Sequence, residues 1–201
     1  MIGKTSRTLG LDPGTRRFGW GVVARDGTRV RHVAHGVIAL GDGPLPQRLA
    51  KLHEALLALV DAHAPSAAAV EGMFFHRDAQ AAAKLGHARG VALLVCGERE
   101  LPVFEYAPAR VKRTVAAYGK AEKAQVAAMV RALLALAEVP ASDAADALAI
   151  ALTHLAGAPA SLPPALAAAL TANRRRVRKK SDISLLLAAR RGASTPSKQT
   201  K

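Results

Sequence analysis

Three strand-type segments open this chain of 201 residues before any helical pattern begins. They cover residues 8–12, 18–24 and 29–40, and their Val, Phe, Trp and Thr residues are types that strands favour. Pro13-Gly14 ends the first segment, and Asp26-Gly27 is a typical hairpin turn between the second and the third. Strands joined by such short turns run antiparallel, so the fold is neither all-helical nor built on a purely parallel sheet.

Helices and strands alternate after these three segments. Leucines at spacings of three and four predict a helix that begins at Leu45 and ends before Pro65. Further strands are predicted over residues 67–71 and 103–106, and further helices over residues 78–100, 108–117, 121–137 and 142–156. This order predicts an α/β fold with a mixed five-stranded sheet and helices on both faces.

Three regions of different composition divide the chain. Residues 1–157 form the predicted folded domain, and residues 158–171 are a linker rich in Pro and Ala. Residues 172–201 form a basic tail, which holds ten of the 29 Lys and Arg residues and one of the 15 acids. With few large apolar residues, this tail is predicted to be disordered.

The formal net charge of +14 points to a polyanionic partner. Nucleic acid fits this charge better than an anionic membrane, since we find no clear amphipathic anchor and no uncharged apolar run of 18 residues. No secretory signal is recognisable near the N-terminus. The single cysteine, Cys96, lies in an apolar segment typical of a buried small side chain, and this cysteine usage fits the reducing cytoplasm.

Four acids stand at the ends of predicted elements. Asp12 and Glu71 each end a strand, so both reach the same edge of the sheet if these strands are parallel neighbours. Asp143 and Asp146 are three residues apart at the start of the last helix, on one face of it. Each acid alone also has a structural explanation: an Asx turn for Asp12, a solvated strand end for Glu71, and a helix cap with a favourable dipole interaction for the last two.

Taken together, the four acids favour a metal site. Such a cluster repels itself unless divalent cations neutralise it, and a set of hard oxygen ligands selects Mg²⁺ or Mn²⁺. In a basic protein this predicts phosphodiester chemistry. In a two-metal site one cation activates the attacking water and the other stabilises the leaving 3′-oxygen, so no Ser, Cys or His nucleophile is needed.

Five groups of motifs follow one another between residues 7 and 156 with little room for gaps. They are Leu9-Gly10-Leu11-Asp12-Pro13-Gly14-Thr15; Val70-Glu71; Lys84-Leu85-Gly86 with Ala88-Arg89-Gly90-Val91-Ala92; Leu101-Pro102-Val103-Phe104-Glu105-Tyr106; and Asp143-Ala144-Ala145-Asp146-Ala147-Leu148-Ala149. In these motifs the chain resembles the RuvC family of crossover junction endodeoxyribonucleases, which resolve Holliday junctions.

The resemblance implies a ribonuclease-H-like fold, a homodimer and a role in DNA recombination and repair alongside the RuvA and RuvB branch-migration proteins. It also implies paired, symmetric, Mg²⁺-dependent nicks across a four-way DNA junction, which leave 5′-phosphate and 3′-hydroxyl ends. By position, Asp12, Glu71, Asp143 and Asp146 match the four metal-binding carboxylates of the family.

The resemblance also suggests DNA-binding residues. Phe74 matches a residue of a DNA-contacting loop in the family, which favours DNA contacts by Phe74, Phe75 and Arg77 over burial of the two phenylalanines in the core. Lys112 and Lys123 match family lysines near the DNA path, although an isolated lysine is usually a solvated surface residue.

Two further assignments concern helices. Residues 84–95 match the helix that pairs the two subunits of the family, although burial inside one subunit would give the same pattern. His154 is interpreted as a helix-end residue and not as a metal ligand.

Three other interpretations compete with a junction resolvase. Sugar kinases and actin-like ATPases share an Asp-x-Gly-Thr hairpin, but they need a second copy of the fold, for which 201 residues leave no room. A compact nuclease of ribosomal RNA processing shares the opening motif but is not expected to carry the later motifs. A junction-binding protein without catalysis predicts the loss of at least one carboxylate, and all four are present.

Overall fold

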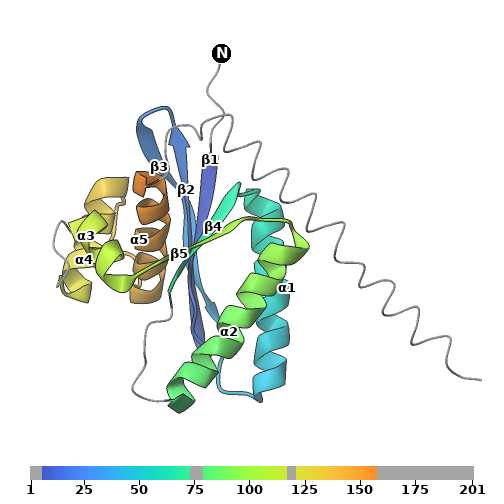
Figure 1. The fold of residues 1–201 in the computed structure, drawn as a ribbon. Coiled ribbons are helices and arrows are strands. Elements are labelled where there is room, and N and C mark those ends of the chain that lie inside the picture. Colours follow the sequence, from blue (N-terminus) through green and yellow to red (C-terminus); the bar gives the residue numbers. More distant parts are fainter. Residues whose placement is uncertain (1–5, 73–78, 117–120, 158–201) are drawn as a thin grey trace, which may run out of the picture. The chain divides into compact units, whose positions relative to one another are not determined.

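The computed structural model describes residues 6–72, 79–116 and 121–157 as a five-stranded sheet with helices on both faces (Figure 1). The strands are β1 (Ser6–Asp12), β2 (Arg17–Asp26), β3 (Arg29–Ala39), β4 (Ala67–Glu71) and β5 (Val103–Tyr106). The helices are α1 (Leu45–His63), α2 (Ala79–Glu98), α3 (Pro108–Ala116), α4 (Lys123–Leu134) and α5 (Ser142–Gly157). The predicted linker and basic tail lie outside the described residues.

The sheet is mixed, as the sequence predicts. Its strand order is β3-β2-β1-β4-β5. The first three strands form an antiparallel meander, and β1, β4 and β5 run parallel to one another. Strands β1 and β4 are therefore the parallel neighbours that are needed to bring their carboxyl ends together.

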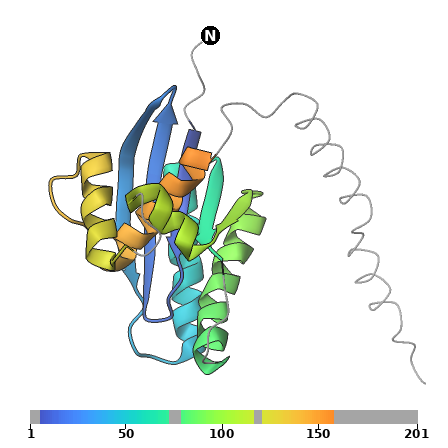
Figure 2. The ribbon, with the colours of Figure 1, turned by 60° about the vertical axis from the view of Figure 1, so that its left-hand side comes forward.

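Two apolar cores lie on opposite faces of the sheet. Helices α1 and α2 cover one face, and α3, α4 and α5 cover the other (Figures 1 and 2). Leu9 and Leu11 of β1 are buried in the core under α1 and α2, whereas Val23 of β2 is buried in the core under α4 and α5. Since side chains alternate along a strand, Gly10 and Asp12 of β1 face the α5 side.

Helix α5 lies against the backbone of the sheet because glycines line its contact. A Cβ atom at Gly10 would lie 1.9 Å from the carbonyl oxygen of Ala147, and one at Gly19 would lie 2.0 Å from the carbonyl oxygen of Asp143. Gly21, on the same face of β2, contacts Leu148 of α5. Small residues on both sides thus allow an approach that any larger side chain would prevent.

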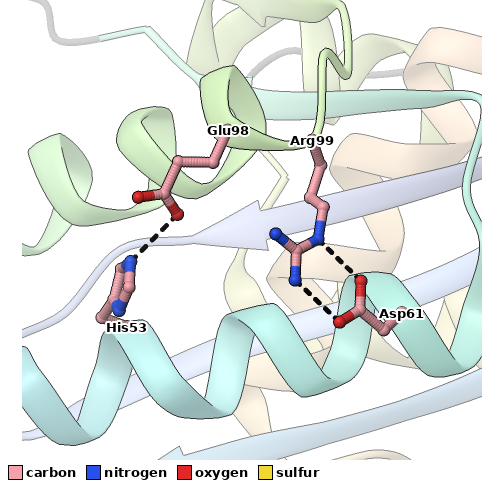
Figure 3. Close-up of polar contacts among 4 residues, drawn as sticks. All are labelled: His53, Asp61, Glu98 and Arg99. Carbon is pink, nitrogen blue, oxygen red and sulfur yellow. Dashed lines mark hydrogen bonds and ion pairs between the residues drawn. The ribbon is translucent and has the colours of Figure 1, made fainter.

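Helices α1 and α2 are joined at their surface by polar contacts (Figure 3). Arg99, which follows α2, donates two hydrogen bonds of 2.7 and 2.8 Å to the carboxylate of Asp61 on α1. His53 and Glu98 form a second contact, with Nε2 and Oε2 3.0 Å apart. The hydrogen bond from Arg99 lowers the pKa of Asp61. These pairs are solvated, so they orient the two helices more than they stabilise the fold.

Element ends differ from the predicted ones by at most a few residues. Helix α4 is expected from residue 121 but begins at Lys123, because Glu122 and Gln125 form a capping box. It ends before Ala135, whose backbone is left-handed with φ of 50°. None of the helices in the described ranges is long and apolar enough to span a membrane.

Candidate active site

Asp12 and Glu71 lie side by side at one edge of the sheet. Leu11 pairs with Val70 in the parallel register of β1 and β4, so the next residues, Asp12 and Glu71, stand opposite each other at the carboxyl ends of the two strands. Ala69 of β4 is buried under α5, and strand alternation puts Glu71 on that same face. Both acids therefore lie on the face of the sheet that α5 covers, and α5 carries Asp143 and Asp146.

The N-terminal turn of α5 brings the second pair of acids to this edge. Gly19 allows the carbonyl of Asp143 to lie directly over β2, and Asp146 follows one turn later on the same side of the helix. The structure thus brings together the four carboxylates that the sequence singled out, one each from β1 and β4 and two from α5.

The electrostatics of Asp12 show that the four acids interact. Burial, followed by the negative charges of Asp146, Glu71 and Asp143, raises the pKa of Asp12 to about 7. The positive charge of Lys123 acts in the opposite direction. Burial and nearby like charges both disfavour the ionised form of a carboxyl group.

Two cationic side chains bond the acids of α5. Arg17, at the start of β2, donates from Nε to Oδ2 of Asp143 over 2.6 Å. Lys123, at the start of α4, donates from Nζ to Oδ2 of Asp146 over 3.1 Å. The hydrogen bond with Asp146 raises the pKa of Lys123, so this amine stays charged.

Sequence reasoning found Lys123 but missed Arg17. Arg17 and Asp143 are 126 residues apart, and only the docking of α5 on β2 brings them together. The one local signal was the position of Arg17 at the end of the Pro-Gly turn that follows Asp12, on the strand next to β1.

A pocket of about 130 Å³ lies beside Asp12, Glu71 and Asp146. It is lined by Asp12, Glu71, Pro108, Val111, Lys112, Lys123, Val126, Asp146 and Ile150. Both lysines suggested by the sequence therefore line the pocket together with three of the four acids. Val111, Val126 and Ile150 give it an apolar wall that strengthens the charge interactions inside it.

The residues around the pocket fit a divalent cation in their chemistry. All four acids offer oxygen ligands, and a bound cation would offset the burial and the neighbouring negative charges that raise the pKa of Asp12. Within the described ranges, no three acidic, histidine or cysteine side chains stand close enough to form a ready metal cage. Asp143 and Asp146 are bonded instead to Arg17 and Lys123.

The remaining candidates fall into two groups. Phe74, Phe75 and Arg77 lie in residues 73–78, outside the described part of the chain. His154 lies in the last turn of α5, as expected of a helix-end residue, and is buried, with its Nδ1 atom 2.9 Å from the hydroxyl oxygen of Tyr106. Burial and the nearby Arg25 lower the pKa of His154, so it serves the core as a neutral hydrogen-bonding residue.

Cys96 is also buried, as the sequence predicts, and burial raises the pKa of its thiol to about 11. Its thiolate is therefore scarce at neutral pH, and Cys96 acts as a small apolar residue of the core under α2.

Comparison with known proteins gives consistent matches over the described domain. The sequence model described as "Crossover junction endodeoxyribonuclease RuvC" matches residues 8–154. A protein of that name from Sorangium cellulosum is 56% identical over 153 residues, which cover 76% of this chain and 86% of the relative. One from Methylorubrum populi is 54% identical over 149 residues, 74% of this chain and 79% of the relative.

A solved structure shows the fold. Thermus thermophilus RuvC, described as a complex with Holliday junction substrate, matches with a TM-score of 0.70 and 40% identity over 75% of this chain and 93% of that chain. The mixed sheet, with its flanking helices, is thus a ribonuclease-H-like fold, as the resemblance implied. With a family match over residues 8–154 and relatives above 50% identity, this chain belongs to the RuvC family of crossover junction endodeoxyribonucleases.

Proposed function

We propose that this chain is a metal-dependent endonuclease that resolves four-way DNA junctions. The observation that carries the proposal is the pocket in which Asp12, Glu71 and Asp146 face Lys112 and Lys123. Carboxylates that hold divalent cations and amines that neutralise phosphate are the two kinds of group that phosphodiester hydrolysis requires. Membership of the family, and the junction substrate of the Thermus thermophilus relative, support the choice of DNA substrate.

We assign the metal site to the four carboxylates. Asp12, Glu71, Asp143 and Asp146 would hold two Mg²⁺ ions, for which Mn²⁺ can substitute, since both cations prefer oxygen ligands. Such ions, when bound, activate water and stabilise the leaving 3′-oxygen. The raised pKa of Asp12 supports this assignment, because burial and, after it, the charges of the neighbouring acids disfavour the ionised form that a bound cation would favour.

The lysines of the pocket are proposed to bind phosphate. Lys112 on α3 and Lys123 on α4 line the pocket together with three of the carboxylates. Their ammonium groups act as point charges, which suits a phosphate whose orientation is set by other contacts. We also propose that Phe74 and Phe75 stack on unpaired bases and that Arg77 contacts the backbone, because they follow Glu71 closely in the chain.

A homodimer is proposed from the two apolar sides of α2. One side, with Ala88, Ala92 and Val95, is buried under the sheet. The other side exposes Leu93 and Leu94, by 38% and 55%. A helix that is apolar on both sides needs a second partner.

The glycines of α2 support this interface. A Cβ atom at Gly86, Gly90 or Gly97 would meet open space outside its own helix backbone, so nothing in the described part of this subunit requires these glycines. Glycine weakens a helix, and a close approach of a second helix accounts for three of them on one helix. A symmetric dimer would present two sites to the two-fold arrangement of a four-way junction. From family membership we further propose that the dimer works with RuvA and RuvB.

The first prediction concerns the carboxylates. Asp12→Asn, Glu71→Gln, Asp143→Asn and Asp146→Asn are each expected to slow Mg²⁺-dependent cleavage of a synthetic four-way junction by at least about 100-fold, because each removes a charged ligand. Junction affinity should change little, since phosphate contacts come from cations. Gel assays with labelled junctions and linear duplexes measure both quantities and map the nicks.

Asp61→Asn is the matched control, because Asp61 is an exposed acid on α1 that pairs with Arg99 away from the pocket. It should cleave like the wild type. A variant of the four that still nicks at the wild-type rate would remove that residue from the metal site. Equal cleavage of linear duplex would refute the junction substrate.

The second prediction concerns the dimer. Light scattering should give about twice the chain mass of 20.9 kDa, and Leu94→Glu should weaken dimerisation by about 100-fold or more, because it buries an unpaired charge. Leu133→Glu is the control, since Leu133 on α4 is 51% exposed and lies on the opposite layer of the fold. A monomeric wild type, or a loss of dimer with Leu133→Glu alone, would contradict the α2 interface.

The third prediction concerns the basic tail, residues 172–201. We propose that its ten cations bind the DNA backbone without reading sequence. Deleting it should leave cut positions and dimerisation unchanged and weaken binding to junctions and duplexes alike. The slope of log K against log salt should become shallower by about 0.9 for each phosphate that the tail neutralises in the full chain. A slope that stays the same would show that the tail does not bind DNA.

A further inference from the structure

Arg89 is a buried arginine of α2 that reaches the end of strand β4. Its residue is 8% exposed. One guanidinium nitrogen, Nη1, donates to the backbone carbonyl oxygen of Glu71 over 2.7 Å. The other, Nη2, lies 2.5 Å from Oε1 of Glu105 on β5. A cation at this depth is accommodated because it has a charged and a polar partner.

This contact is made from the face of the sheet opposite the pocket. Tyr106 of β5 is buried in the core under α3 to α5, so the preceding residue, Glu105, faces α1 and α2. Arg89 meets Glu105 on that side. Glu71 lines the pocket on the other side, and Arg89 holds its backbone carbonyl.

The carbonyl of Glu71 lies where the sheet itself offers no donor. Ala68 of β4 and Gly72, which follows this strand, donate their backbone N–H groups to the carbonyls of Pro102 and Tyr106, on the β5 side. Backbone groups alternate along a strand, so those of Glu71 point towards β1.

In the register of β1 and β4, Asp12 stands opposite Glu71, and the next donor on β1 would be the N–H of residue 13. That residue is Pro13, which has no N–H. Arg89 thus donates to the Glu71 carbonyl, from the face of the sheet that α2 covers, the hydrogen bond that β1 cannot supply.

We propose that Arg89 is a positioning residue for Glu71: by holding the Glu71 carbonyl, it fixes the end of β4 and the direction in which the Glu71 carboxylate enters the pocket. The inference rests on the proposed role of Glu71 as a metal ligand. Arg89 is not among the described residues that line the pocket, and its hydrogen bond at this site goes to the backbone carbonyl of Glu71, so it acts through that backbone. Changing a partner that orients a metal ligand typically costs about 10–100-fold in metal affinity or activity.

The test compares Arg89→Met with Arg99→Met. Both variants remove an arginine that ties α2 to a neighbouring element, but Arg99 pairs with Asp61 on α1, away from the pocket (Figure 3). Arg89→Met is expected to raise the Mg²⁺ concentration for half-maximal junction cleavage by about tenfold. Calorimetric titration of Mg²⁺ into the DNA-free protein should show the same weakening, whereas junction affinity should stay within about twofold of the wild type.

Arg99→Met should keep the wild-type Mg²⁺ dependence in both measurements. Arg89→Lys keeps the charge beside Glu105 but cannot hold both oxygens as the planar guanidinium does, so a shift of about threefold is expected. If Arg89→Met does not fold, the Mg²⁺ dependence of Arg89→Lys tests the positioning role. Glu105→Gln, which leaves the bond to Glu71 in place, should behave like the wild type.

Wild-type Mg²⁺ dependence in both Arg89 variants would overturn the inference, as would an equal shift in Arg99→Met. Glu71→Gln separates this failure from a failure of the proposed function. If Glu71→Gln abolishes cleavage while the Arg89 variants match the wild type, only the positioning role of Arg89 is wrong. If Glu71→Gln itself binds Mg²⁺ and cleaves normally, the metal assignment fails first.

Discussion

Close packing of α5 on the glycines of β1 and β2 is the contact on which the site depends. The backbone carbonyls of Ala147 and Asp143 occupy the space that Cβ atoms at Gly10 and Gly19 would need. Interiors packed at this density do not yield to an extra methyl group without a shift of the elements. The contact therefore sets the height of the α5 N-terminus over the sheet, and with it the place of Asp143 and Asp146 beside the ends of β1 and β4.

The same arrangement concentrates negative charge at one edge of a basic molecule. Arg17 and Lys123 bond two of the acids, and burial together with the charges of the other three acids raises the pKa of Asp12. The face of the sheet behind the pocket contributes as well, because Arg89 completes the hydrogen bonding of the β4 end where Pro13 cannot. A rigid strand end on one side and a closely docked helix on the other give the carboxylates fixed positions, which is what a site for charged ligands requires.

Much of this follows from the sequence. The order of strands and helices, the parallel pairing suggested for β1 and β4, and the choice of the four acids all came from local patterns and from element ends. The partner of Arg17 could not be predicted, because it depends on the docking of α5 far along the chain. The role of Arg89 could not be predicted either, because this arginine lies in a helix of mostly small and apolar residues and one of its two partners is a backbone carbonyl, which carries no sequence signal. The start of α4 was predictable from the Glu122 to Gln125 capping box, which the periodicity argument overlooked.

The most direct test of this account is a Gly19→Ala variant, measured for stability and for Mg²⁺-dependent junction cleavage. Its Cβ would meet the carbonyl of Asp143, so the account predicts a loss of about 1–3 kcal/mol in the free energy of unfolding. Cleavage should fall by about 100-fold as the α5 carboxylates move. Gly43→Ala, whose Cβ would meet only the Gln47 side chain at 3.9 Å, should match the wild type. Wild-type stability and cleavage in Gly19→Ala would show that the docking of α5 on these glycines does not position the site.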